Sequence, residues 1–249
     1  MRVDVFFSAQ ELNASDVSNR VVAVIDVLRA STTIAVALAN GARNIIPFES
    51  SDEVVLRSKS YERGEVRLAG ERKMLAVPGF DFGNSPREFT PEAVQGKTVL
   101  FATTNGTPAL VAVQAARDVV VGAYVNFSAV LTLLHTAIRG GADVTIVCAG
   151  RERQFSLEDA ACAGRFVRLL SDRPSHPVTL NDGARAALEL ERGFGDELGR
   201  LFEVSAHGQA LREAGLEEDL SICGVVDSYP VIPIYSDRQI TRLGPDRER

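Results

Sequence analysis

The residues best suited to chemistry follow a short apolar run near the N-terminus. Residues 21–25 are predicted to form a buried strand, and Asp26 stands where that strand ends. Arg29 comes three residues later, and a run of hydroxyl side chains then opens a helical pattern. In an open parallel sheet, ligands bind beyond the carboxyl ends of the strands, beside helix N-termini. A carboxylate, a guanidinium and hydroxyls gathered there are suited to a metal-bridged phosphate.

Similar polar clusters recur at other predicted strand ends. One follows the strand at 66–69, another lies in the Gly- and Pro-rich segment 70–92, a third precedes a helix at 108–116, and a fourth surrounds the start of the helix at 157–170. The members of these clusters are Glu71, Arg72, Asp81, Asn84, Ser85, Thr104, Asn105, Gly106, Arg151, Glu158 and Asp159. Their shared placement at strand ends predicts a single ligand site.

The elements that must position these residues alternate along the chain. Strands are predicted at 21–25, 44–48, 66–69, 98–102, 119–121, 143–147, 222–226 and 231–235, and helices at 33–40, 51–62, 108–116, 127–139, 157–170, 184–192 and 209–214. Such alternation is typical of an α/β protein, a three-layer α/β/α sandwich with a mainly parallel sheet. The β-loop-α-β units at 21–48 and 98–121 suggest two similar halves. We expect one domain over residues 1–240 and a frayed, charged tail at 241–249.

Composition narrows the class of protein. The chain has 249 residues, 45% of them hydrophobic, with a net charge of −6, which disfavours a general nucleic-acid binder. Three cysteines without a C-x-x-C pair indicate neither a disulfide framework nor a zinc site. The N-terminus is too quickly polar for a signal peptide, and no apolar run has the length of a membrane span. We therefore expect a cytoplasmic protein with no nucleic-acid or membrane partner; homo-oligomerisation stays open.

Several familiar catalytic motifs are absent or misplaced. The chain has no P-loop and no G-x-G-x-x-G fingerprint, and Leu28 stands where a D-x-D phosphatase has its second carboxylate. Cys162 and Arg168 have the spacing of a cysteine phosphatase but fall inside a strongly periodic helix, which favours coincidence. His207 is isolated in the sequence, and a lone histidine is more often structural.

Each polar cluster also has a purely structural interpretation. Strand-end aspartates often tie down turns, so a ligand role and a structural role for Asp26 weigh about equally. Arg29 could simply pair with Asp26, and Asn84-Ser85-Pro86 is an ordinary turn. Asp159 occupies the last position of a capping box that begins at Ser156, so capping is its leading role.

Six ordered motifs resemble those of the 2-phosphosulfolactate phosphatase family. They are Asp26-Val-Leu-Arg-Ala-Ser-Thr-Thr33, Ala69-Gly-Glu-Arg72, Phe80-Asp-Phe-Gly-Asn-Ser-Pro86, Thr103-Thr-Asn-Gly-Thr107, Cys148-Ala-Gly-Arg151 and Glu158-Asp-Ala-Ala-Cys-Ala-Gly164. The resemblance runs from about residue 3 to the Asp227 region. It implies an α/β three-layer fold and a Mg²⁺-dependent hydrolase that releases phosphate from 2-phospho-3-sulfolactate, a step of coenzyme M synthesis.

The residues and the resemblance together predict the following site. We expect catalysis by Asp26, Arg29, Glu71 and Asn105, with Mg²⁺ held by Asp26, Glu71 and Asp81 and with Glu158 and Asp159 in reserve. The residues expected to bind the small anionic substrate are Arg29, Ser31, Thr32, Arg72, Asn84, Ser85, Thr104, Asn105, Gly106 and Arg151. Two alternatives stay open: a non-catalytic binder of a phosphorylated or sulfonated acid, and a structural subunit whose polar turns are incidental.

Overall fold

The computed structural model describes residues 1–62, 64–172 and 177–244. Its strands are β1 (Arg2–Phe6), β2 (Val21–Ile25), β3 (Asn44–Phe48), β4 (Val66–Arg72), β5 (Leu75–Ala76), β6 (Thr98–Ala102), β7 (Asp118–Gly122), β8 (Val144–Cys148), β9 (Thr179–Leu180), β10 (Pro233–Ser236) and β11 (Gln239–Arg242). Its α-helices are α1 (Ala30–Ala39), α2 (Ser51–Ser58), α3 (Pro91–Val94), α4 (Gly106–Ala112), α5 (Phe127–Arg139), α6 (Leu157–Ser171), α7 (Asp182–Phe194), α8 (Leu198–Val204), α9 (Ala206–Glu213) and α10 (Glu217–Cys223). None of the helices in these ranges is long and apolar enough to cross a membrane.

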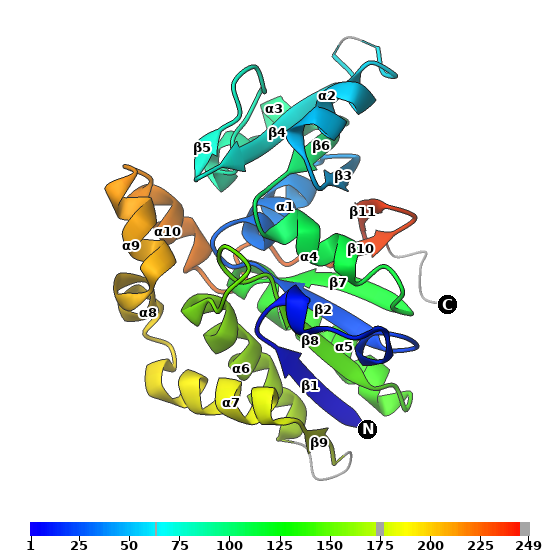
Figure 1. Cartoon of the computed structure of the whole chain (residues 1–249), viewed down its shortest axis with the longest axis vertical. Coiled ribbons are helices and arrows are strands. Elements are labelled where there is room, and N and C mark those ends of the chain that lie inside the picture. The colour runs from blue at the N-terminus through cyan, green and yellow to red at the C-terminus, as the bar shows by residue number, and fades with distance from the viewer. Residues whose placement is uncertain (63, 173–176, 245–249) are drawn as a thin grey trace.

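The strands form one mixed, mostly parallel sheet in the order β5-β4-β6-β3-β11-β10-β7-β2-β8-β1-β9 (Figure 1). β7, β2, β8, β1 and β9 pair in parallel, and so do β3, β6 and β4. The antiparallel hairpin β10–β11 joins these two groups through β7 and β3. The predicted site residues lie at or after the carboxyl ends of β2, β4, β6 and β8, in the last residues of β4, in the loops that follow the strands and in the first turns of the next helices.

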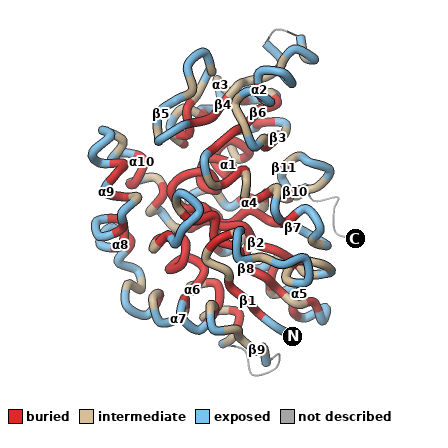
Figure 2. The backbone as a smooth tube through the Cα atoms, in the orientation of Figure 1, coloured by how far each residue is buried: buried red, intermediate tan, exposed pale blue. Residues whose placement is uncertain are grey.

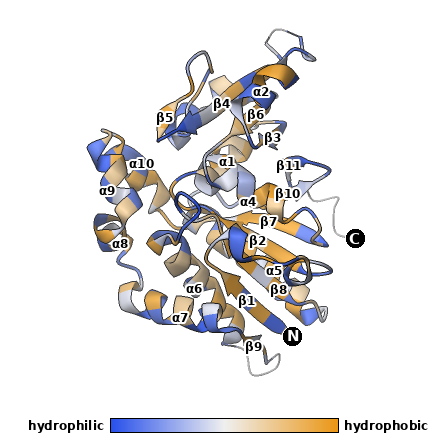
Figure 3. Cartoon of the chain, in the orientation of Figure 1, coloured by the Kyte–Doolittle hydropathy of each residue, from blue (hydrophilic) through white to orange (hydrophobic). Residues whose placement is uncertain are grey.

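Helices cover both faces of the sheet, which confirms the three-layer α/β/α prediction. β2 shows why, because it lies between two parallel neighbours and all five of its residues are buried. Val21, Ala23 and Ile25 pack into a core shared with α5 and α6, whereas Val22 and Val24 pack into a core shared with α1 and α4. The sequence of a strand that is buried on both faces is a continuous run of apolar residues. The central strands are accordingly buried in Figure 2 and hydrophobic in Figure 3.

The two β-loop-α-β units predicted from the sequence are present as β2–α1–β3 and β6–α4–β7. Each unit begins in one parallel group and ends in the other, since β2 pairs with β7 and β3 pairs with β6. The first unit therefore passes from the group that contains β2 to the group that contains β3, and the second unit passes back from β6 to β7. The hairpin β10–β11 lies between the two groups. This crossing brings the loops after β2 and β6 to the same place.

Some element boundaries differ from the predictions. α1 begins at Ala30 instead of residue 33, and α4 begins at Gly106 instead of residue 108. The strand predicted at 222–226 is wrong, because the first two of these residues complete α10 and the others form a turn. A short apolar run does not distinguish a buried helix end from a strand.

The first two residues of the predicted C-terminal tail lie in a strand. Thr241 and Arg242 belong to β11, which the sequence did not reveal because its polar residues surround one buried side chain, Ile240. Residues 245–249 of the predicted tail lie outside the described residues.

Candidate active site

One cavity of about 380 Å³ gathers residues from the ends of four strands. Asp26 follows β2, Glu71 lies near the end of β4, Thr103 follows β6, and Arg151 follows β8. The complete lining is Asp26, Leu28, Arg29, Glu71, Lys73, Met74, Asn84, Thr103, Thr104, Asn105, Arg151, Glu152 and His207. The structure thus brings together strand-end motifs that are far apart in the sequence.

Asp26 is held rigidly at the end of β2. Its backbone N–H donates to the Ser31 hydroxyl at 2.9 Å, and its carboxylate accepts the Ala30 N–H at 3.2 Å. Burial raises the pKa of this carboxyl to about 6. The neighbouring His207 and the Ala30 N–H oppose the rise, whereas the carboxylates of Glu71 and Glu158 add to it. Asp26 is therefore a buried acid whose charge the protein compensates only in part.

Glu71 faces the same cavity and is also nearly buried. One carboxylate oxygen accepts the Thr104 N–H at 2.7 Å, and the other accepts the Met74 N–H at 2.9 Å. These bonds tie the end of β4 to the loop after β6. They fix both carboxylate oxygens and leave each with further capacity to accept a hydrogen bond or bind a cation.

The loop after β6 forms a compact turn beside Asp26. Thr103 and Thr107 exchange two bonds between side chain and backbone, at 3.0 and 3.1 Å. A Cβ at Gly106 would lie 2.7 Å from Asp26 Oδ2 and 2.5 Å from the Ala30 Cβ, so only glycine permits this approach of α4 to α1. Gly106 does not line the cavity; its role in the described structure is this close contact.

Asn84 and Ser85 serve different purposes. The Asn84 amide lines the cavity, and its Oδ1 is buried with no hydrogen-bond donor among the described residues. Such an unsatisfied group calls for an explanation, and a bound ligand is one. The Ser85 hydroxyl instead donates to Asp219 at 2.6 Å and does not line the cavity.

Ser31 and Thr32, predicted to bind substrate, do not line the cavity either. Ser31 accepts the Asp26 N–H, and the Thr32 hydroxyl donates to the Val27 carbonyl at 2.8 Å. Because α1 starts earlier than predicted, these side chains fall within its first turn and point into the protein.

Arg29 is engaged by a buried carboxylate that the sequence did not indicate. Its guanidinium donates to Asp219 at 2.7 Å and to the Met74 carbonyl at 3.0 Å. The side chains of Arg29 and Asp219 are only 2% and 1% exposed. Since Asp219 also accepts the Ser85 hydroxyl, this pair joins α10, the loop before α1 and the turn at Asn84. Arg29 still lines the cavity, but its charge is largely neutralised.

Asp219→Asn is expected to lower the free energy of unfolding by about 3 kcal/mol, because it leaves the Arg29 guanidinium buried without a counter-charge. Urea unfolding of both proteins measures this loss. The neighbouring Glu218→Gln is the matched control, since Glu218 forms an exposed pair with Arg87. We expect that control to change stability by less than about 1 kcal/mol. Equal effects of the two substitutions would contradict the importance of the buried pair.

Three predicted metal ligands do not line the cavity. Asp81 is exposed and accepts the Leu68 N–H at 2.8 Å. Asp159 accepts the Val27 N–H at 2.8 Å and the Gly150 N–H at 3.1 Å, which ties β2 to the loop after β8. Burial and the nearby carboxylates raise its pKa well above the usual range. Within the described ranges, no three His, Cys, Asp or Glu side chains form a metal-ligand group.

Glu158, the third of these residues, pairs with His207. Its Oε1 lies 3.3 Å from His207 Nδ1, and the two side chains are 1% and 12% exposed. Burial disfavours the charged carboxylate, but the contact with His207 and the donors at the start of α6 together outweigh burial and lower the pKa of Glu158. The sequence offered no signal for His207, because helix α9 brings it to the cavity from a region without motifs.

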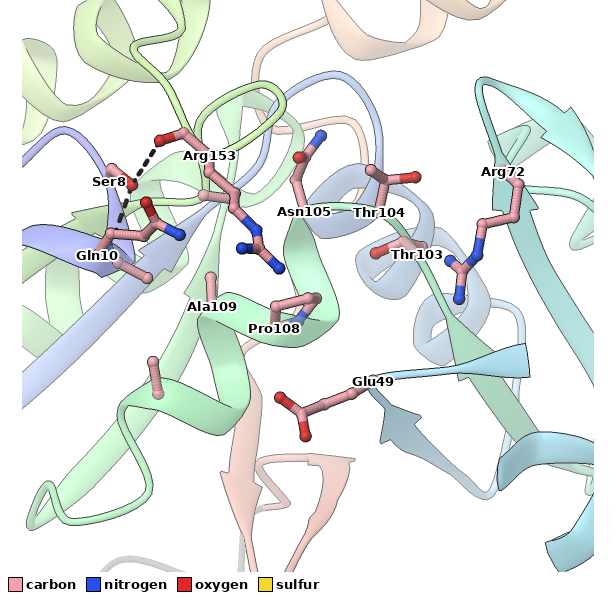
Figure 4. Close-up of a pocket in the computed structure, with 13 residues that line it drawn as sticks. Ser8, Gln10, Glu49, Arg72, Thr103, Thr104, Asn105, Pro108, Ala109 and Arg153 are labelled. Atoms are coloured by element: carbon pink, nitrogen blue, oxygen red, sulfur yellow. Dashed lines mark hydrogen bonds between the residues drawn. The ribbon is translucent and has the colours of Figure 1, made fainter. Parts of the chain in front are cut away.

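A second hollow, of about 410 Å³, lies on the other side of the loop after β6. Thr103, Thr104 and Asn105 line both spaces. Figure 4 shows the guanidinium groups of Arg72 and Arg153 reaching into this hollow from opposite sides, with Glu49 below them. No described carboxylate forms an ion pair with either arginine. The sequence analysis did not predict a role for Arg153. The direction of its side chain depends on a turn in which Glu152 and Arg153 both have positive φ, and the sequence does not indicate that turn.

The cysteine-phosphatase alternative fails on geometry. Cys162 is fully buried within α6, and burial raises the pKa of its thiol well above the usual range. Arg168 pairs with Glu191 of α7 at 3.0 Å instead of facing Cys162 across a phosphate loop. This thiol packs as a small apolar group.

Comparisons with known proteins agree with the motifs. The model of the family described as 2-phosphosulpholactate phosphatase matches residues 6–238. A protein of Symbiobacterium thermophilum named "Probable 2-phosphosulfolactate phosphatase" is 39% identical over 230 residues, which covers 92% of this chain and 97% of that protein. A protein of the same name from Clostridium acetobutylicum is 34% identical over 240 residues, covering 96% of this chain and all of that protein. The chain therefore belongs to the 2-phosphosulfolactate phosphatase family.

Proposed function

We propose that this protein is a Mg²⁺-dependent phosphatase that hydrolyses 2-phospho-3-sulfolactate to 3-sulfolactate and phosphate. Family membership supports the reaction class and the substrate. The observation in the structure that carries the proposal is the shared cavity, whose lining includes two carboxylates, Asp26 and Glu71, and the arginine Arg151. A metal-bound phosphate requires this combination of oxygen ligands and a cation.

Asp26 and Glu71 fit the requirements of Mg²⁺. This ion typically takes one or two protein carboxylates and completes its octahedron with water and substrate phosphate, so a larger protein ligand set is not required. Burial, with a smaller contribution from Glu71, raises the pKa of Asp26 and so disfavours its negative charge. A divalent cation would relieve that cost. When bound, Mg²⁺ would supply charge neutralisation for the phosphate and polarise its oxygens.

The remaining cavity residues are suited to holding the phosphate. Arg151 has no carboxylate partner in the part of the chain described here, and its planar fork can bind two phosphate oxygens. The Asn105 side chain accepts the Glu152 N–H at 2.9 Å, which holds the Arg151 loop against the loop after β6. Asn84 offers an amide oxygen with no partner among the described residues.

The second hollow is suited to the other acid groups of the substrate. The substrate carries a carboxylate and a sulfonate besides phosphate. We assign the binding of these two groups to Arg72 and Arg153, whose guanidinium groups reach into the hollow (Figure 4). The loop of Thr103–Asn105 borders both spaces, so a ligand that reaches across it could use both sets of cations. With this substrate the reaction would be a step of coenzyme M synthesis. Three buried, unpaired cysteines are in keeping with a reducing cytoplasm.

Phosphate release from a small panel tests the proposal. The panel comprises 2-phosphosulfolactate, 2-phospholactate and isopropyl phosphate, each assayed with Mg²⁺ and with EDTA. We expect release only with Mg²⁺, fastest from 2-phosphosulfolactate. Saturable binding of 2-phosphosulfolactate without release would instead indicate the non-catalytic binder. If neither metal nor substrate raised the melting temperature, the structural alternative would stand, because only a ligand of the native state shifts that equilibrium.

A further inference from the structure

His207 is positioned beside the cavity by elements distant from the strand-end motifs. It lies at the start of α9, where the Ser205 hydroxyl caps the helix by accepting the Gly208 N–H at 3.0 Å. A Cβ at Gly208 would lie 2.0 Å from the Phe202 carbonyl oxygen, so α9 packs against the end of α8 without room for a side chain there. The position of the imidazole is therefore fixed by packing.

The contact with Glu158 orients the ring. Glu158 is at the start of α6 and does not line the cavity, so its buried carboxylate serves the imidazole rather than a ligand. At 3.3 Å from Oε1, the Nδ1 atom is the nitrogen that faces the carboxylate. The two atoms are in ion-pair contact without the geometry of a hydrogen bond, and the carboxylate holds the Nδ1 side of the ring toward α6. The opposite nitrogen, Nε2, is left for the cavity.

The proposed reaction needs a proton donor at this cavity. Hydrolysis of the phosphate ester of a secondary alcohol expels an alkoxide, which is a poor leaving group unless it receives a proton. In the proposed site, Asp26 and Glu71 would hold the metal ion, and Arg29 is paired with Asp219. Guanidinium groups do not lose a proton in proteins. Lys73 and Glu152 also line the cavity, but both are exposed to solvent. Imidazole exchanges a proton readily near neutral pH, and His207 is the histidine of the cavity lining, with a side chain only 12% exposed.

We propose that His207 is the general acid of the reaction and that Glu158 is its positioning residue. This inference rests on the proposed phosphatase function. The bond between phosphorus and the ester oxygen breaks, its electron pair stays on that oxygen, and the oxygen takes the proton from Nε2. Water supplies the hydroxyl of the new bond to phosphorus, and its released proton leaves to solvent. A proton from solvent then restores His207.

A pair of substrates that differ only in the leaving group tests the role of His207. The first is 2-phosphosulfolactate, and the second is its analogue with fluorine in place of both hydrogens on the sulfonate-bearing carbon. Fluorine makes the leaving alkoxide less basic and leaves every anionic group in place. We expect His207→Asn to lower kcat about 100-fold or more for the natural ester but less than about tenfold for the fluorinated one.

The ratio of the two rates does not depend on how much of the variant is folded, so partial unfolding cannot imitate the result. His207→Gln provides a second variant, and Glu158→Gln is expected to show the same selectivity with a smaller loss. His135→Asn is the control, because its Nε2 contacts the Leu169 carbonyl at 3.1 Å and it is not part of the cavity lining. Equal losses on both substrates, or no loss on either, would overturn the role of His207. A wild-type protein that hydrolyses neither ester would instead refute the phosphatase function itself.

Discussion

Asp26→Asn is expected to lower Mg²⁺-dependent phosphate release by more than about 100-fold, beyond the usual effect of losing an outer partner of a metal site. The substitution removes the charge of Asp26 and keeps its shape, including an oxygen that can accept the Ala30 N–H. The same variant is expected to be more stable than the wild type when metal is absent. Residues that serve function often lower the stability of the folded protein in this way.

The pH dependence of stability follows from the raised pKa of Asp26. Its value rises from 3.8 to about 6 on folding, so between these pH values the folded protein binds more protons than the unfolded chain. The contribution of Asp26 to the free energy of unfolding of the wild type therefore falls across this range as pH rises. The amide of the Asp26→Asn variant cannot ionise, so the advantage of the variant grows from near zero below about pH 4 to at most about 3 kcal/mol above pH 6.

Urea unfolding in EDTA at several pH values measures this difference, and the melting temperature with added Mg²⁺ measures metal binding. Mg²⁺ is expected to stabilise the wild type and to have little effect on Asp26→Asn. Asp81→Asn is the matched control, because Asp81 is an exposed carboxylate outside the cavity. A folded Asp26→Asn protein with normal turnover would remove Asp26 from the catalytic site. A variant less stable than the wild type in EDTA at pH 7 would show that the charge of Asp26 supports the fold.

The sequence predicted the centre of the site because parallel strands impose a simple rule. Residues that follow buried parallel strands collect at the carboxyl ends of those strands, and the apolar runs of β2, β6 and β8 marked these ends clearly. Asp26, Thr104 and Arg151 could be assigned to one cavity on that basis alone. Glu71 followed from the same rule, although β4 extends past the predicted strand to include it.

Side-chain direction within the loops was harder to predict. An error of three residues in the start of α1 turned Ser31 and Thr32 from candidate ligands into groups that secure the protein's own backbone. Charge pairing was harder still. Asp219, which pairs with Arg29, is 190 residues away in the sequence. No local sequence pattern could have predicted that these two residues form a pair.

Residues contributed by the helical region after 171 could not be predicted at all. That region has no strand-end rule to place its side chains, since its helices dock by packing of apolar faces. Leu201, Phe202, Leu211 and Leu220 bury themselves in the core beside α6, and this packing carries His207 and Asp219 to the site. A lone histidine in an unremarkable helix becomes informative only after that packing is known.

Lysine substitutions of the site arginines are expected to divide into two kinds. Arg151 lies in the cavity with Asp26, whereas Arg72 and Arg153 reach into the second hollow. Lysine keeps the charge but loses the planar fork that binds an anion through two donors. Arg151→Lys should therefore slow hydrolysis of every phosphomonoester. Arg72→Lys and Arg153→Lys should mainly affect substrates that carry additional acid groups. Each lost charged hydrogen bond is worth about 1.5–3 kcal/mol, which is about 10- to 150-fold in kcat/KM.

Isopropyl phosphate and 2-phosphosulfolactate separate the two kinds, because both are esters of secondary alcohols and only the second carries a carboxylate and a sulfonate. Arg151→Lys should reduce kcat/KM for both by similar factors, and Arg72→Lys and Arg153→Lys should reduce it only for 2-phosphosulfolactate. Arg139→Lys, at the end of α5 and outside both spaces, is the control. Equal losses on both substrates at Arg72 and Arg153 would mean that the second hollow does not hold the distal acid groups. The phosphate would then have to be bound from both sides of the loop after β6, and Asn105, which borders both spaces, would be the next residue to test.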